Sequence, residues 1–245
     1  PFGLAVGHAT DARGITGCTV VRGVAAPFRC AHALLGRASG ARELAAATPD
    51  HLVDRVDALL LTGGSAYGLD AAAGVMRWCE AHGRGYPVGV GVVPIVPAAV
   101  LFDLAVGDPA ARPTPDMAHA ACEAATAHVD EAMQGSVGVG TGATLGKALG
   151  PTRALKGGVG MAVVGAGAVR AFALAAVNAL GDVRDAEGRI VAGARADDAG
   201  APPFRFADTA RTLAAQAAAH GAEGRSPFGN TTLAVVALSV PLARE

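Results

Sequence analysis

The chain has 245 residues, 51% of them hydrophobic, which is enough for one substantial core, so we expect one domain spanning 1–245. Its formal net charge of −1 gives no electrostatic basis for binding nucleic acid or an anionic membrane surface, and we expect neither partner. Apolar runs are interrupted well short of the roughly 20 residues that a membrane helix needs. No signal-peptide pattern precedes Asp11 and Arg13, so the sequence predicts a cytoplasmic protein.

Metal and disulfide chemistry have little support in the sequence. The four cysteines are far apart and form no C-x-x-C pair, which argues against a zinc site and against a disulfide scaffold. His119 and His128 are spaced so that one helix would not bring them together as two metal ligands. The sequence therefore predicts no metal and no cofactor.

The first half of the chain alternates short apolar runs with glycine-rich turns. A continuous apolar run such as Ala58–Leu61 is typical of a buried strand. Thr48 followed by Pro49 suits the N-cap and the first position of a short helix. The expected elements are strands at 2–6, 16–21 and 58–61, a helix reaching residue 56, and a helix that runs from the loop 62–68 through residue 81.

The second half begins with the segment 92–104, which carries Pro94 and Pro97 inside an apolar run. Because proline interrupts helices and central strands, we expect a buried, shaped loop there that leads into a short element. The expected elements after it are helices at 115–133 and within 205–221, strands at 161–164, 172–178 and 189–191, and a buried strand at 233–238.

Two glycine-rich segments invite motif assignments that the sequence does not support. A nucleophile elbow around Ser65 would need Gly at the position of Tyr67. The segment 140–147 resembles a phosphate-binding loop, but no Ser or Thr follows Lys147. We therefore expect neither an elbow-type serine hydrolase nor a nucleotide-binding protein.

The tetrapeptide Gly229-Asn230-Thr231-Thr232 stands at the mouth of the last expected strand. If the Asn230–Thr231 bond breaks, Thr231 gains a free α-amine whose ordinary pKa is about 7.7–8.0. Such an amine can act as the base for the threonine's own hydroxyl, which makes the residue a nucleophile. By itself, however, the tetrapeptide also fits a turn that enters a strand.

Asn178 lies inside the apolar segment Ala175-Ala176-Val177-Asn178. A buried Asn without hydrogen-bond partners costs about 1–3 kcal/mol. The residue is therefore either tied structurally to its neighbours or directed into a site.

The sequence resembles the DmpA-like P1 (S58-type) family of self-cleaving peptidases, which includes L-aminopeptidase/D-esterases, β-aminopeptidases and nylon-oligomer hydrolases. The matching segments occur in the family's order along the chain. They are VGHAT (6–10), TGCTV (16–20), LTGGSAYGLDAA (61–72), VPIVPAAVLFDL (93–104), GTGA (140–143), KGG (156–158), VN (177–178) and GNTT (229–232).

The resemblance implies a four-layer α/β/β/α sandwich of the DmpA/ornithine-acetyltransferase type, made as a precursor that cleaves itself. The cleaved bond would be Asn230–Thr231, giving an α subunit 1–230 and a β subunit of which 231–245 is the start, with Thr231 as the catalytic nucleophile. Lys147 matches the position of an active-site Lys, and Asn178 matches an Asn that helps to bind the oxyanion. Phe102 falls where the nylon-oligomer hydrolases have a Tyr, so that hydroxyl is absent here.

The implied activity is that of an N-terminal-nucleophile hydrolase acting on small peptides, amides or esters. The candidate substrate-pocket residues are Phe102, Gly64, Ser65 and Tyr67. Members of the family form homo-oligomers such as tetramers, and we expect one here. In the family the chain continues well beyond the nucleophile, so we expect the sandwich formed by these 245 residues to be incomplete at its C-terminal side. The alternative is a catalytically silent relative that acts as a subunit or small-molecule binder.

Overall fold

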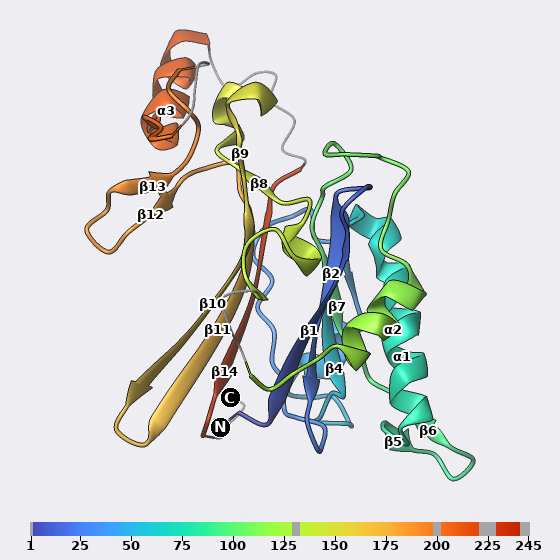
Figure 1. Cartoon of the computed structure of the whole chain (residues 1–245). Helices are drawn as coiled ribbons and strands as arrows, with labels where there is room; N and C mark the ends of the chain where they lie inside the picture. Colours follow the sequence, from blue (N-terminus) through green and yellow to red (C-terminus); the bar gives the residue numbers. More distant parts are fainter. Residues whose placement is uncertain (1, 129–132, 198–201, 221–228, 241–245) are drawn as a thin grey trace.

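The protein is described by a computed structural model covering residues 2–128, 133–197, 202–220 and 229–240. Within these residues two β-sheets pack face to face, and two α-helices cover the outer face of one of them (Figure 1). The space between the two sheets is filled by apolar side chains from both. This arrangement places the end of the second sheet, where the candidate residues lie, beside the loops of the first.

The first sheet has five strands in the order β1-β2-β4-β7-β3. Most pairs are antiparallel, whereas β4 and β7 are parallel. The expected strands at 2–6, 16–21 and 58–61 are confirmed. The strands are β1 (Leu4–Asp11), β2 (Thr16–Gly23), β3 (Ala41–Arg42), β4 (Ala58–Thr62) and β7 (Ala98–Val100).

Strand β7 is a short element within 92–104, where the sequence predicts a loop that leads into one. Pro97 lies immediately before the strand, where its missing N–H is not needed, and its carbonyl oxygen accepts a hydrogen bond from the Leu60 amide at 3.0 Å. The proline therefore leads into an interior strand of the sheet without removing one of its hydrogen bonds.

Helices α1 (Ala72–Ala81) and α2 (Pro115–Glu123) form the layer outside the first sheet. Helix α2 starts as its sequence indicates, since the Thr114 side chain accepts a hydrogen bond from the Met117 amide. The predicted helix at 115–133 is too long. The chain leaves the helix after Glu123 because Thr126 and Val6 exchange two backbone hydrogen bonds, at 2.9 and 3.0 Å.

The predicted helix ending at residue 56 is wrong. A short 3₁₀ helix, Leu44–Ala47, precedes this segment, and the Thr48 hydroxyl donates to the Ala45 carbonyl at 2.8 Å, so Thr48 closes a turn rather than starting one. Val56 pairs with Phe28 in a β-bridge.

The second sheet consists of β10 (Gly158–Ala166), β11 (Val169–Asn178) and β14 (Thr231–Leu238), antiparallel and in that order. The strands predicted at 161–164, 172–178 and 233–238 are confirmed. Strand β14, however, is buried on one face only, because the outward-facing Val236 is 70% exposed. The inner face of this sheet packs on the first sheet through Phe172, Leu174, Ala176 and Val235.

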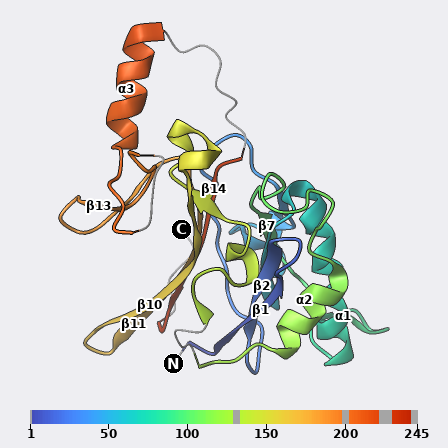
Figure 2. The same cartoon turned by 45° about the horizontal axis from the view of Figure 1, so that its top comes forward.

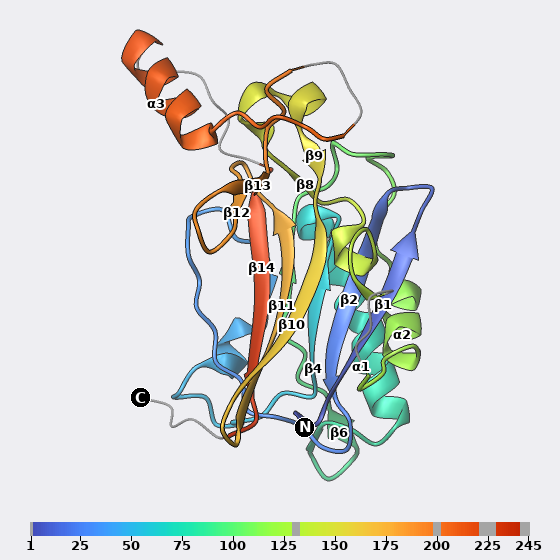
Figure 3. The ribbon, with the colours of Figure 1, turned by 60° about the vertical axis from the view of Figure 1, so that its left-hand side comes forward.

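Helix α3 (Thr209–His220) confirms the helix expected within 205–221. It extends beyond one end of the sheets and does not cover the outer face of β10-β11-β14 in any of three views (Figures 1, 2 and 3). The described residues thus form an α/β/β stack, with the outer face of the second sheet uncovered. None of the described helices has the length and apolarity required to cross a bilayer.

Several short elements connect the main ones. They are η2 (Ser65–Ala71), β5 (Tyr86–Pro87), β6 (Val92–Val93), η4 (Gly138–Gly140), β8 (Thr144–Leu145), η5 (Lys147–Leu149), η6 (Pro151–Arg153), β9 (Leu155–Lys156), β12 (Val183–Arg184) and β13 (Ile190–Ala192). Strand β13 corresponds to the strand expected at 189–191.

The close packing of β1 against α2 predicts a large effect of one methyl group. A Cβ at Gly7 would overlap the Ala121 carbonyl oxygen and lie 2.8 Å from the Ala125 backbone. We expect Gly7→Ala to lower the free energy of unfolding by about 1–3 kcal/mol, measured by urea denaturation. The matched control is Gly160→Ala in β10, where a Cβ meets nothing within 4 Å. Equal effects of the two substitutions would contradict this account of the packing.

Candidate active site

The candidate residues meet where β11 ends and β14 begins. In the antiparallel register Asn178 lies directly opposite Thr231, and residues opposite each other project to the same face of a sheet. Leu233 and Val235 share the face of Thr231 and pack into the inter-sheet core. The side chains of Asn178 and Thr231 therefore face the same space, at the end of the apolar core.

The Asn178 side chain is fully buried and hydrogen-bonded at both ends. Its Nδ2 donates to the carbonyl oxygens of Phe102, at 2.8 Å, and Gly229, at 3.2 Å. Its Oδ1 accepts from the Thr144 amide at 3.1 Å and from Lys147 Nζ at 2.7 Å. The opposite amide orientation would place donors against donors and acceptors against acceptors, so these neighbours define which atom is the nitrogen.

Lys147 is held over Asn178 by its own backbone. The Lys147 amide donates to the Leu180 carbonyl at 2.9 Å, and the Gly146 amide donates to the Gly181 carbonyl at 3.0 Å, which ties this turn to the chain just after β11. Gly146 has a φ of 69° in the left-handed region, where glycine is favoured. From there Nζ reaches the Gly229 carbonyl oxygen at 2.6 Å.

Burial lowers the pKa of Lys147 from 10.5 to about 8, because removal from water disfavours the charged amine. At neutral pH the amine is still mostly protonated and can donate its hydrogen bonds. Above pH 8 it becomes mostly neutral, which leaves a primary amine with a free lone pair inside the site.

The residues before Thr231 lie against Phe102. Gly229 has a φ of 97°, and a Cβ at that position would contact the Phe102 ring at 3.5 Å. The Asn230 side-chain oxygen, Oδ1, is buried and has no hydrogen-bond partner in the described residues. The predicted residues Thr231, Asn178, Lys147, Asn230 and Phe102 are thus brought together, although their chemical roles stay predictions.

The other predicted pocket residues, Gly64, Ser65 and Tyr67, lie in the loop and 3₁₀ helix that follow β4. The Gly64 amide donates to the Asp103 carboxylate at 2.7 Å, so it is linked to the residue that follows Phe102. Ser65 adopts a left-handed φ of 53°, which is uncommon for a residue with a side chain. Tyr67 is exposed, and the Arg112 guanidinium lies 3.6 Å from its ring centroid. No described contact joins Ser65 or Tyr67 to Asn178 or Thr231.

Two residues of this region were not singled out from the sequence. Asp103 is buried behind Phe102, and Thr144 supplies the amide that binds Asn178. A carboxylate directly after a candidate site residue was a usable signal for Asp103. Nothing local marks Thr144, because its role rests on a backbone amide rather than on a side chain.

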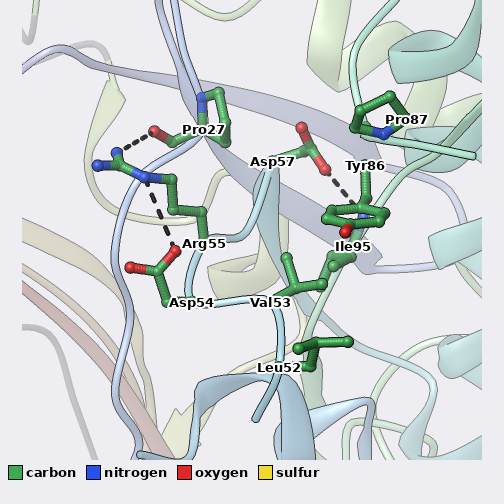
Figure 4. A pocket seen from close by; sticks show the side chains of 10 residues that line it. Pro27, Leu52, Val53, Asp54, Arg55, Asp57, Tyr86, Pro87 and Ile95 are labelled. Carbon is green, nitrogen blue, oxygen red and sulfur yellow. Dashed lines mark hydrogen bonds and ion pairs between the residues drawn. The ribbon is translucent and has the colours of Figure 1, made fainter.

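A separate cavity of about 240 Å³ lies near the start of β4, at the end of this strand opposite Gly64. It is bounded by the segment 52–57 and the β5–β6 hairpin (Figure 4). Its buried polar group is Asp57, whose Oδ2 accepts a hydrogen bond from the Ile95 amide at 2.9 Å. In the described parts of the chain, no group of three His, Cys, Asp or Glu side chains is arranged to hold a metal ion.

Comparison with known proteins identifies the family. The sequence profile described as peptidase family S58 matches residues 2–245. The chain belongs to peptidase family S58. It is 53% identical over 151 residues to an uncharacterized aminopeptidase of Mycobacterium tuberculosis, covering 61% of this chain and 41% of that protein. It is 32% identical over 191 residues to a 6-aminohexanoate-oligomer endohydrolase of Kocuria sp., covering 78% of this chain and 50% of that one. The chain therefore spans half or less of the length of these relatives.

Solved structures confirm the predicted mixed α/β fold. The PH0078 protein of Pyrococcus horikoshii matches with a TM-score of 0.63 and 18% identity, over 98% of this S58 chain and 62% of that one. The L-aminopeptidase D-Ala-esterase/amidase of Ochrobactrum anthropi, described as a variant of the Ntn-hydrolase fold, matches with a TM-score of 0.57 and 18% identity, over 72% and 51%. At this level of identity the likeness concerns the fold alone.

The lowered pKa of Lys147 can be measured directly because the chain has only two lysines, Lys147 and Lys156. In protein labelled with ¹³C-lysine we expect one Cε resonance to titrate with a midpoint of about 8. Lys147→Met removes that resonance, and Lys156→Met is the matched control that leaves it in place. A midpoint near the ordinary 10.5 for Lys147 would contradict its burial.

Proposed function

We propose that this S58 protein is a hydrolase activated by its own cleavage between Asn230 and Thr231, which then removes N-terminal residues from small peptides, amides or esters. The observation that carries the proposal is the pairing of Thr231 with Asn178 at the entrance to β14, beside the Lys147 amine. It supports the proposal because the Thr231 hydroxyl and two hydrogen-bond donors then lie together at the end of a buried core.

Cleavage would follow the balanced chemistry of an N-to-O acyl shift. The Thr231 hydroxyl oxygen attacks the Asn230 carbonyl carbon, the peptide C–N bond breaks, and the nitrogen takes the hydroxyl proton. Water then hydrolyses the resulting ester, which leaves a carboxylate on Asn230 and a free α-amine on Thr231. The two products are the proposed α subunit, 1–230, and a β subunit that begins at Thr231.

The intact chain already engages the donors that hydrolysis requires. Lys147 Nζ and Asn178 Nδ2 both donate to the Gly229 carbonyl oxygen, one residue before the bond to be cut. We infer that a substrate carbonyl takes over these donors once residues 229–230 have left. A donor directed at a developing oxyanion contributes about 3–4 kcal/mol to catalysis. The Thr231 α-amine serves as base, and the mechanism requires no cofactor.

One further observation supports cleavage at this place, and a second supports hydrolysis in general. The buried, unpartnered Oδ1 of Asn230 costs about 1–3 kcal/mol, which departure of the residue would recover. The names of the relatives, an aminopeptidase and an oligomer endohydrolase, both describe hydrolysis.

The Phe102 ring and the Gly64 loop would line the substrate pocket, with Ser65 and Tyr67 at its outer rim.

The second candidate function is a catalytically silent subunit or small-molecule binder, and Phe102 is the observation that favours it. The family resemblance implies a Tyr at this position in the nylon-oligomer hydrolases, and Phe cannot supply its hydroxyl.

We further propose a homo-oligomer as the working form. The uncovered outer face of the second sheet, with Val164 and Val236 exposed, is apolar surface that assembly would bury.

Substitution of Thr231 tests the cleavage. By denaturing mass spectrometry we expect the wild-type protein to give two polypeptides that split after Asn230, and Thr231→Ala to give one intact mass. Thr232→Ala is the matched control, because its side chain lies on the opposite face of β14, and it should cleave like the wild type. A single intact mass in fresh, folded wild-type protein would overturn the proposal.

Restoring the missing hydroxyl separates the two candidate functions. We expect Phe102→Tyr to raise kcat for aminoacyl p-nitroanilides by about tenfold, a modest share of the 10²–10³ that a well-placed oxyanion donor contributes. If the wild type, Thr231→Ala and Phe102→Tyr all release p-nitroaniline at the same rate, the silent alternative is favoured.

A further inference from the structure

Asp103 is a buried carboxylate at the catalytic end that the proposed mechanism does not use. The residue is only 2% exposed. Its Oδ2 accepts a hydrogen bond from the Thr16 hydroxyl and its Oδ1 accepts one from the Gly64 amide, both at 2.7 Å. Burial raises the pKa of Asp103, while these two donors and the charge of Lys156 act in the opposite direction. Asp103 thus connects β2, the loop after β4 and the segment after β7.

The backbone packs too closely around this carboxylate for it to move. A Cβ at Gly63 or at Gly142 would overlap the Asp103 side chain. Lys156 holds the segment that contains Gly142 from its other side, since its amine donates to the carbonyl oxygens of Thr141 and Ala143. The carboxylate therefore has one available position.

That position controls a hydrogen bond of the candidate active site. The Phe102 carbonyl and the Asp103 amide belong to one planar peptide unit. Because the Asp103 side chain is fixed at Thr16 and Gly64, this unit cannot rotate freely, and its carbonyl oxygen stays 2.8 Å from Asn178 Nδ2. If residues 229–230 leave, the Phe102 carbonyl is the remaining described acceptor for Asn178 Nδ2, while the Thr144 amide and Lys147 Nζ still donate to Oδ1.

We propose that Asp103 is a positioning residue, which fixes the Phe102 carbonyl through Thr16 and Gly64 and thereby holds the Asn178 side-chain amide in its donor orientation. The catalytic consequence rests on the proposed function, whereas the positioning itself does not. The role depends on geometry rather than on charge. In Asp103→Asn the amide oxygen can still accept from Gly64, and the Thr16 hydroxyl can turn to accept from the new NH₂ group.

The chain provides a direct reporter, because Asn178 and Asn230 are its only asparagines. Protein labelled with ¹⁵N-Asn therefore shows two side-chain NH₂ pairs. The Thr231→Ala background keeps the chain intact, and adding Asn230→Asp leaves only the Asn178 pair. We expect Asp103→Ala to shift this pair and to speed the hydrogen exchange of its protons. Asp103→Asn adds an NH₂ pair of its own, and we expect it to leave the Asn178 pair close to the parent position.

Asp57 supplies the matched control. It is also a buried carboxylate, 4% exposed, that accepts a backbone amide hydrogen bond, but it lies beside the cavity of Figure 4 at the other end of β4. The five residues of β4 place the two ends about 16 Å apart at about 3.3 Å per residue. We expect Asp57→Ala to lower the melting temperature as Asp103→Ala does, without shifting the Asn178 pair.

The functional arm uses the chain with Thr231 in place. We expect Asp103→Ala to slow cleavage after Asn230. We also expect it to lower kcat by about a hundredfold, which is the effect of one misplaced oxyanion donor, and to change KM less. Asp103→Asn should recover at least tenfold of this loss, and Asp57→Ala should stay within threefold of the wild type.

The outcomes separate the two proposals. If Asp103→Ala leaves the Asn178 resonances unmoved, or if Asp57→Ala moves them equally, the positioning role is overturned. If the resonances shift as expected but no variant or wild-type protein cleaves or hydrolyses, positioning stands and the proposed function fails. Should Asp103→Ala not fold, Thr16→Val removes one of the two anchors and carries the same NMR test, in which an unmoved Asn178 pair overturns the proposal.

Discussion

The candidate site depends on the register between β11 and β14. Their ladder runs from Ala171 opposite Leu238 to Asn178 opposite Thr231. A slip of one residue would exchange the two faces of β14 and bring Thr232 inward in place of Thr231. Both faces of β14 are apolar beyond Thr232, so the fit of Leu233, Val235 and Ala237 against the first sheet opposes this slip, rather than apolarity alone. Side-chain packing along the strand thus sets the position of a hydroxyl group at its end.

The candidate active site is polar although it continues an apolar core. Asn178, Lys147 and Asp103 are each removed from water, wholly or in part, and each makes at least two hydrogen bonds to groups distant in sequence. Buried polar groups that share partners are costly to rearrange, because displacing one leaves its neighbours unpaired. These shared hydrogen bonds therefore make the site rigid as well as stable. Asn230 is the exception, and it lies beside the bond proposed to break.

The sequence pattern predicted correctly the elements that depend on neighbouring residues alone. Uninterrupted apolar runs such as Ala58–Leu61 and the burial of Asn178 followed from the sequence. The family resemblance selected Thr231, Asn178, Lys147 and Phe102, which lie close together in the fold, and also Ser65 and Tyr67, which do not contact them. A short element was expected within 92–104, but it was not identified as strand β7, because Pro97 signals interruption unless its place just before the strand is known. Helix α2 was drawn too long, because its end depends on the pairing of Thr126 with the distant Val6. The partners of Asn178 were equally out of reach, since Phe102 and Thr144 meet it only through the tertiary fold.

Strand β14 pairs, within the described residues, with β11 alone, and one of its faces is open to solvent. In an uncut chain this edge strand is covalently tethered and re-forms its ladder as a unimolecular event. Once severed ahead of Thr231, the strand would be retained by non-covalent contacts only, and renaturation would become a bimolecular encounter that slows on dilution. The mature form would then owe its persistence to slow unfolding rather than to reversible equilibrium.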